Sequence, residues 1–179
     1  TALLLALSAK DYVAAGHTER VRDLAVRLGE AVGLSKTEMA DLAVLAEVHD
    51  LGKVGIPDRI LFKQGPLTEG EELEMREHTT IGYRIAKACN HLSHIADLIL
   101  YHHEWWDGGG YPTGLRGEEI PIACRILSIV DAFDAMTNDR PYHTARSEQR
   151  ALEELRRCAG SQFDPRLVER FADVLARHR

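Results

Sequence analysis

An adjacent histidine and aspartate, His49 and Asp50, end an apolar helical run and stand directly before the Leu-Gly-Lys of residues 51–53. Apolar residues at positions 42, 45 and 46 recur at helical spacing, and His49 continues this stripe one turn later. Its imidazole is therefore expected to point inward. A buried imidazole beside a buried carboxylate needs a partner, because an unpaired polar group in a core costs on the order of a few kcal/mol. A lone histidine of this kind is usually a core residue bonded to a local group.

Further imidazoles and carboxylates lie on similar apolar stripes, and a metal ion is the natural partner for such a set. The inward candidates are His17, His49, Asp50, His78, His102, His103 and Asp131. This set exceeds what one zinc ion uses, but it suits two octahedral ions that share a bridging carboxylate. Mixed nitrogen and oxygen ligands favour iron or manganese, while zinc and nickel stay open on affinity alone. Two such ions can polarise a phosphate and activate water, which fits phosphodiester cleavage.

Helical periodicity runs through most of the chain, without sustained two-residue alternation, and predicts an all-α fold. The 179 residues, 45% of them apolar, fit one domain over residues 1–179. Residues 1–13 resemble the middle of a helix, which suggests that the chain was cut from a longer sensor or response-regulator protein. No apolar run approaches the roughly 20 residues of a membrane span, and the cysteines lack metal or disulfide spacing. We therefore expect a cytoplasmic domain without membrane contact.

Capping signals predict where the helices begin. One helix is expected to open near residues 16–17 and to stop at residue 33. Ser35 with Glu38, and Thr68 with Glu71, form capping-box patterns. The helix after Thr68 is expected to continue through residues 73–85, with a histidine on its apolar face. Other helices are expected around residues 95–100, 120–136 and 147–157 and after residues 164–165.

The apolar run over residues 120–136 contains two aspartates. Asp131 interrupts the most apolar part, so we expect it to face inward and to be paired. Asp134 could occupy a solvent-facing position. The net charge of −6 argues against a general DNA-binding or RNA-binding face. An anionic substrate would instead need locally concentrated positive charge, which bound divalent metals would supply.

Several ordered motifs together resemble the HD-GYP domain, a branch of the HD phosphohydrolases. They are HDLGKVGIPD at residues 49–58, HHE at 102–104, DGGGYP at 107–112, DRPY at 139–142 and FDP at 163–165. The resemblance covers nearly the whole chain. It implies a helical bundle with a Gly-rich GYP loop that hydrolyses cyclic di-GMP to linear pGpG, with further hydrolysis to GMP left open.

The resemblance also implies residue roles. One metal would take His17, His49, Asp50 and Asp131, and the other Asp50, His78, His102 and His103, so that Asp50 is the bridge. Lys53 would lie against the scissile phosphate, where it stabilises charge or protonates the leaving oxygen. Substrate contacts would also come from Gly110, Tyr111, Arg140 and His143. In the family the GYP loop is linked to GGDEF-type diguanylate cyclase partners, and a homodimer remains open.

Three positions depart from the family pattern. Trp105 follows Glu104 where Arg or Lys is frequent, and His143 stands where Lys is usual. Val13 replaces a Glu that binds a third metal in some members, so two ions are expected. Two other functions stay open: a receptor or protein-interaction module that binds cyclic di-GMP without turnover, and an HD phosphohydrolase for another nucleotide.

Overall fold

The computed structural model describes residues 16–138 and 145–177 of the chain. Helices provide its regular structure, and within these ranges there is no strand, only an isolated bridge between Ala159 and Phe163. The predicted all-α fold is confirmed. The helices are α2 (His17–Ala31), α3 (Lys36–Val48), η1 (Leu51–Gly55), α4 (Asp58–Leu61), α5 (Glu69–Arg76), α6 (His78–Lys87), η2 (Ser93–Ile95), α7 (Ala96–Tyr101), η3 (Gly117–Glu119), α8 (Ile122–Thr137), α9 (Glu148–Arg157) and α10 (Pro165–Ala176).

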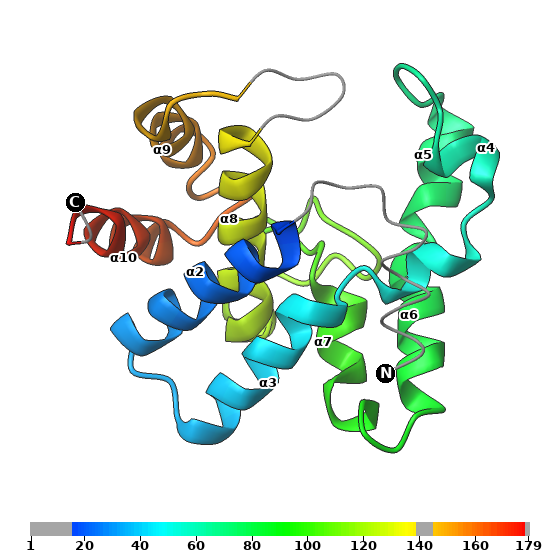
Figure 1. Ribbon diagram of the computed structural model, residues 1–179, viewed down its shortest axis with the longest axis horizontal. Coiled ribbons are helices and arrows are strands. Elements are labelled where there is room, and N and C mark those ends of the chain that lie inside the picture. The colour runs from blue at the N-terminus through cyan, green and yellow to red at the C-terminus, as the bar shows by residue number, and fades with distance from the viewer. Residues whose placement is uncertain (1–15, 139–144, 178–179) are drawn as a thin grey trace.

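Helix α8 is central to the packing (Figure 1). It contacts α2, α3, α7, α9 and α10, while α6 packs against α7 and η1. The apolar core follows these contacts, and the rings of Phe133 on α8 and Phe171 on α10 meet edge to face with centroids 5.1 Å apart. The loop between α7 and α8 crosses the middle of the molecule, between α8 and the α6–α7 pair (Figure 1). This arrangement brings the ends of α3 and α7 and the start of α6 toward α8.

The predicted helix starts agree with the structure where capping signals were present. Both capping boxes form: the Ser35 hydroxyl accepts from the Glu38 amide, and Thr68 and Glu71 make the equivalent pair. Helix α2 begins at His17, directly after Gly16, whose φ of 88° suits a glycine. The two capping-box boundaries depend on bonds within one turn, which explains why the sequence alone predicts them.

The helix predicted to run unbroken from Thr68 to residue 85 is instead two helices, α5 and α6, separated at Glu77. Leu73 lies within the span of the expected helix but is 60% exposed, and α5 has no buried residue. Helix α5 is stabilised locally by its capping box and by the acidic residues of its first turn. The apolar stripe therefore belongs to α6 alone, and His78 begins that helix.

No helix in the described ranges is both long and apolar enough to cross a membrane. The helix expected over residues 1–13, Val13 included, lies outside the described residues, as do Arg140 and His143. The one-domain organisation and the origin in a longer protein stay predictions.

Candidate metal centre

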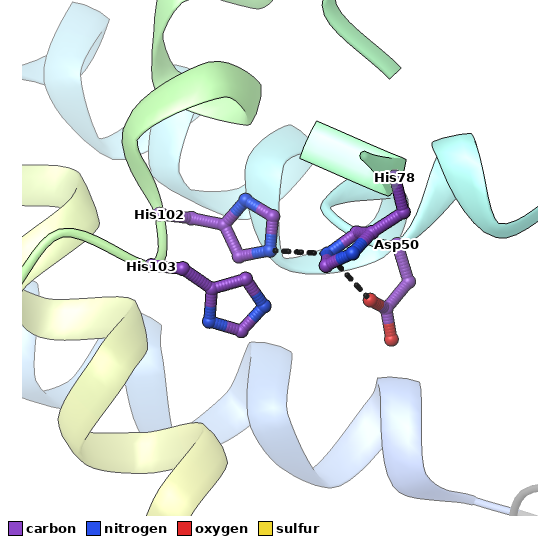
Figure 2. Close-up of side chains that lie close together, drawn as sticks. All are labelled: Asp50, His78, His102 and His103. Atoms are coloured by element: carbon purple, nitrogen blue, oxygen red, sulfur yellow. Dashed lines mark hydrogen bonds and ion pairs between the residues drawn. The ribbon is translucent and has the colours of Figure 1, made fainter. Parts of the chain in front are cut away.

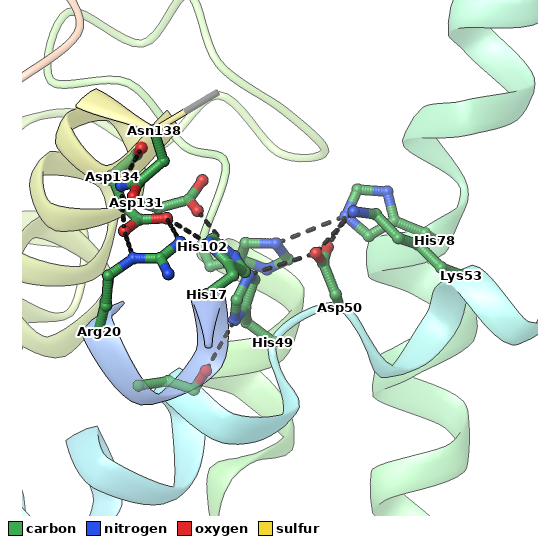
Figure 3. A network of polar contacts seen from close by, with 11 residues as sticks. His17, Arg20, His49, Asp50, Lys53, His78, His102, Asp131, Asp134 and Asn138 are labelled. Atoms are coloured by element: carbon green, nitrogen blue, oxygen red, sulfur yellow. Dashed lines mark hydrogen bonds and ion pairs between the residues drawn. The ribbon is translucent and has the colours of Figure 1, made fainter. Parts of the chain in front are cut away.

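Asp50 lies beside His78, His102 and His103 in one group of potential metal ligands (Figure 2) and also faces a second group that includes His17 and His49 (Figure 3). Its Oδ1 is 3.8 Å from Nε2 of His78, and its Oδ2 is 3.4 Å from Nε2 of His49. The first group is Asp50, His78, His102 and His103, and the second is His17, His49 and Asp131. Within each group the potential ligand atoms lie within 4.8 Å of one another. The two oxygens of one carboxylate thus face both groups, as those of a bridging ligand would.

Every predicted ligand falls in one of these two groups, although their role in metal binding stays a prediction. His49 and Asp50 follow α3 directly, and His102 and His103 follow α7. In Figure 2 the His102 and His78 rings point toward each other, with their Nε2 atoms 3.4 Å apart. Except for Asp131, which lies within α8, the candidate ligands therefore come from helix ends, which the fold brings together.

Gly52 allows the approach that joins η1 to α6. A Cβ atom at this position would overlap the carbonyl oxygen of His78 and lie 2.5 Å from the amide nitrogen of Gly82. Any larger residue would push η1 away from the first turns of α6. Because Asp50 directly precedes η1, this close packing fixes its distance from His78.

Three of the histidines share the same local hydrogen bond. Nδ1 of His49, His78 and His102 donates to the carbonyl oxygen three residues earlier, at 3.1, 2.7 and 2.7 Å. The acceptors are Ala46, Met75 and Ile99. A donor bond from Nδ1 fixes the tautomer in which Nε2 carries the free lone pair. In its neutral form each ring therefore offers Nε2 to the centre.

His17 is oriented by a carboxylate instead (Figure 3). Its Nδ1 is 2.6 Å from Oδ2 of Asp134, and its Nε2 is 3.5 Å from Oδ1 of Asp131. Asp134 also accepts from Arg20 Nε at 2.6 Å and from Asn138 Nδ2 at 2.9 Å. It is 2% exposed, so the solvent-facing position considered for it is wrong. Its three-residue spacing from Asp131, which puts both on one helical face, was the available signal.

The charges at the centre favour a cation. Burial lowers the pKa of His49, but the carboxylates of Asp50 and Asp131 outweigh it and raise the pKa to about 9. Burial would raise the pKa of Asp50, yet Lys53 and His49 hold it well below its usual value. The carboxylates that retain a proton on His49 would equally favour a metal ion in its place.

Burial keeps His78, His102 and His103 neutral. Burial lowers the pKa of His78 and His102, and it lowers that of His103 to about 3. Neutral imidazole is the form that binds metals. Ionised carboxylates and neutral imidazoles with convergent nitrogen atoms fit divalent transition-metal ions.

Lys53 lies at the edge of this centre. Its Nζ donates to Oδ2 of Asp50 at 2.6 Å, and its side chain is 25% exposed. The ammonium group is thus held beside the carboxylate that faces both ligand groups. This placement suits the predicted contact with a phosphate, which itself stays a prediction.

The Gly-rich loop reaches the centre through Tyr111. Its ring stacks on His103, with centroids 4.9 Å apart and an interplanar angle of 28°, and the Arg76 guanidinium lies 5.0 Å from the tyrosine centroid. Gly110 permits this contact, because a Cβ there would overlap the Trp105 amide nitrogen and come to 2.5 Å from the His103 carbonyl oxygen. Both predicted loop residues therefore adjoin the candidate ligands.

Glu104 holds the loop and had no role assigned from the sequence. It is 3% exposed, and its carboxylate accepts bonds from the amides of Thr113, Gly114 and Leu115 at 2.7, 3.0 and 3.1 Å. Carboxylates bonded to several backbone amides fix a loop firmly. Its place in the HHE motif was the signal, but its partners depend on how the loop folds.

A cavity of about 100 Å³ adjoins the centre. Candidate ligands line it together with an aromatic and an amide side chain; these residues include His49, His102, His103, Asp131, Trp105 and Gln162. The cavity places an aromatic surface beside the proposed metals.

The chain is similar to known proteins over most of its length. The HD domain profile matches residues 4–167. A cyclic di-GMP phosphodiesterase of Thermotoga maritima is 45% identical over 157 residues, covering 87% of this chain and 43% of that protein. The cyclic di-GMP phosphodiesterase response regulator RpfG of Xanthomonas campestris is 40% identical over 169 residues, covering 93% and 45%.

A solved cyclic GMP-AMP-specific phosphodiesterase from Vibrio cholerae has the same fold, with a TM-score of 0.75 and 22% identity over 97% of this chain and 47% of that one. The chain thus spans less than half the length of these proteins. The chain belongs to the HD domain family, and to the HD-GYP branch that its motifs resemble.

Proposed function

We propose that this chain is the catalytic domain of a metal-dependent phosphodiesterase that opens cyclic di-GMP to linear pGpG. The observation that carries the proposal is Asp50, whose two oxygens face the two groups of candidate ligands. The proposed ligands of one ion are His17, His49, Asp50 and Asp131, and those of the other are Asp50, His78, His102 and His103. Iron and manganese suit this donor set best.

The bound ions would polarise the phosphate and lower the pKa of water. The chain's own residues would orient the reaction. Lys53 Nζ, next to Asp50, would contact the phosphate and supply positive charge or a proton to the leaving oxygen. Tyr111 would border the substrate on the side of His103, where its ring is stacked. Glu104 would hold the loop that carries Tyr111.

The choice of cyclic di-GMP rests on the relatives named for that activity. Two relatives named as cyclic di-GMP phosphodiesterases are 45% and 40% identical to this chain, whereas a relative that is 37% identical and a structural neighbour are named for cyclic GMP-AMP. Cyclic GMP-AMP is therefore the substrate to compare. The GGDEF-type partner of the GYP loop and the cytoplasmic location belong to the same proposal.

Hydrolysis by the metal-loaded protein tests this function. The protein is purified without oxygen, loaded with iron or manganese, and incubated separately with cyclic di-GMP and cyclic GMP-AMP, with products separated by chromatography. We expect linear pGpG from cyclic di-GMP, and none from metal-stripped protein. Tight binding of cyclic di-GMP without turnover would refute the enzyme and indicate a receptor, and exclusive cleavage of cyclic GMP-AMP would change the substrate.

A further inference from the structure

Trp105 is an exposed aromatic side chain beside the candidate metal centre. Three large apolar side chains are exposed in the described ranges: Phe62 at 48%, Leu73 at 60% and Trp105 at 39%. Phe62 and Leu73 belong to the α4–α5 region, whereas Trp105 lines the cavity next to the centre. An indole exposed at such a place offers a binding surface, because a group stacked on it would remove apolar area from water.

The lining of the cavity combines candidate metal ligands with residues outside that set. His102, His103 and Asp131 belong to the candidate ligands. Trp105 and Gln162 do not. At about 100 Å³ the cavity is smaller than the roughly 300–1,000 Å³ of pockets that enclose whole drug-sized ligands. It suits one planar group attached to a larger ligand that extends outside.

The loop around Trp105 is held in place by backbone bonds. The amide of Trp106 donates to the carbonyl oxygen of Gln162 at 3.1 Å, and the amide of Asp107 donates to that of Ser161 at 2.9 Å. The indole also lies against the loop, because a Cβ at Gly109 would be 3.4 Å from its Cε3 atom. A platform fixed before binding loses little conformational entropy when a ligand stacks on it.

We propose that Trp105 is a stacking surface for one nucleobase of the cyclic dinucleotide, with the Gln162 amide available to the edge of that base. The inference rests on the proposed function, since the ligand is its substrate. Every nucleobase has a flat aromatic face, so stacking on an indole adds affinity for any of them. An amide can both donate and accept, which makes Gln162 a candidate reader of the base.

Tryptophan fluorescence can test this directly, because the chain has only two tryptophans. Trp106→Phe leaves Trp105 as the single reporter, and Trp105→Phe leaves Trp106 as the matched control. Each metal-loaded variant is titrated with a phosphorothioate analogue of cyclic di-GMP that resists hydrolysis. We expect saturable quenching in Trp106→Phe and little change in Trp105→Phe. Calorimetry on the same samples gives the affinity independently of fluorescence.

Substitution of the indole should weaken binding in proportion to the lost stacking. We expect Trp105→Ala to raise the Kd by about 5- to 150-fold, the range found when bases lose an aromatic partner. Trp105→Phe should stay within about threefold of wild type, because it retains an aromatic face. Circular dichroism and metal content of Trp105→Ala should match wild type, since the side chain is exposed and coordinates nothing in the proposal.

The outcomes separate this inference from the proposed function. Turnover by wild type together with an unchanged Kd in Trp105→Ala would overturn the stacking role and leave the enzyme intact. An unquenched Trp105 during calorimetrically detected binding would do the same. Failure of the metal-loaded wild type to bind the analogue or to cleave cyclic di-GMP would refute the function, and this inference with it.

Discussion

Replacing Asp134 with asparagine should impair metal binding through His17. In the structure Nδ1 of His17 donates to Asp134, which leaves Nε2 directed toward Asp131. An asparagine amide can donate to Nδ1 instead, so the ring would then carry its proton on Nε2. That tautomer cannot bind a metal with Nε2.

The expected loss can be estimated from the contacts of Asp134. Substitutions of groups that orient metal-binding histidines typically cost about 10- to 100-fold in affinity, or about 1.4 to 2.7 kcal/mol. The asparagine oxygen can still accept the hydrogen bond from Arg20 Nε, which lies 2.6 Å from Asp134 Oδ1 in the unaltered protein. The substitution therefore removes the negative charge but keeps part of the network. We expect the free energy of unfolding to fall by about 1.5–3 kcal/mol, the contribution typical of a hydrogen bond to a charged group.

Metal titration of stripped Asp134→Asn by calorimetry, with elemental analysis of loaded protein, measures the effect. Only the affinity for the ion that His17 would bind should fall. Asp164→Asn is the matched control, because Asp164 is also 2% exposed and pairs with Arg125 Nη1 at 2.8 Å. It should reduce stability without changing metal affinity. Wild-type affinity for both ions in Asp134→Asn would refute this account of His17.

Three further predictions concern the centre and its loop. Asp50→Ala removes the carboxylate that faces both ligand groups. Elemental analysis should therefore find that both ions are lost, and hydrolysis assays should find no activity. Full metal content would show that the bridge is assigned wrongly. Loading stripped protein at pH 7.5 should release about one proton per chain, because His49 with its pKa of about 9 is protonated there and His103 with its pKa of about 3 is not. The release should vanish as the pH rises above 9, and calorimetry in buffers of different ionisation enthalpy measures it; equal release at pH 7.5 and 10 would contradict the assignment. Gly110→Ala should lower kcat by about 100-fold, because its Cβ overlaps backbone and must displace Tyr111; an unchanged rate in steady-state assays would show that the loop position does not matter.

Local signals explain what the sequence predicted well. The capping boxes at Ser35 and Thr68 involve residues three apart, and both formed as expected. The stripe ending in His49 likewise placed its imidazole inside, where it is 5% exposed. Such features depend on one helix at a time, so a single sequence contains the information.

Non-local contacts explain what the sequence did not predict. Asp134 is buried because Arg20 and His17, more than a hundred positions earlier, supply its donors. The break at Glu77 was hidden because apolar residues continue at helical spacing on both sides of it. Glu104 gains its partners only when the following loop folds back over it. None of these contacts is encoded by spacing alone.

The central claim is that two ions around Asp50 act together in cleaving cyclic di-GMP. Titrating metal-stripped protein with Mn²⁺ under anaerobic conditions, while measuring pGpG formation at each bound-metal ratio, tests it most directly. We predict that activity stays low up to one ion per chain and reaches its plateau near two. Full activity with one ion, or two bound ions without any pGpG, would contradict it.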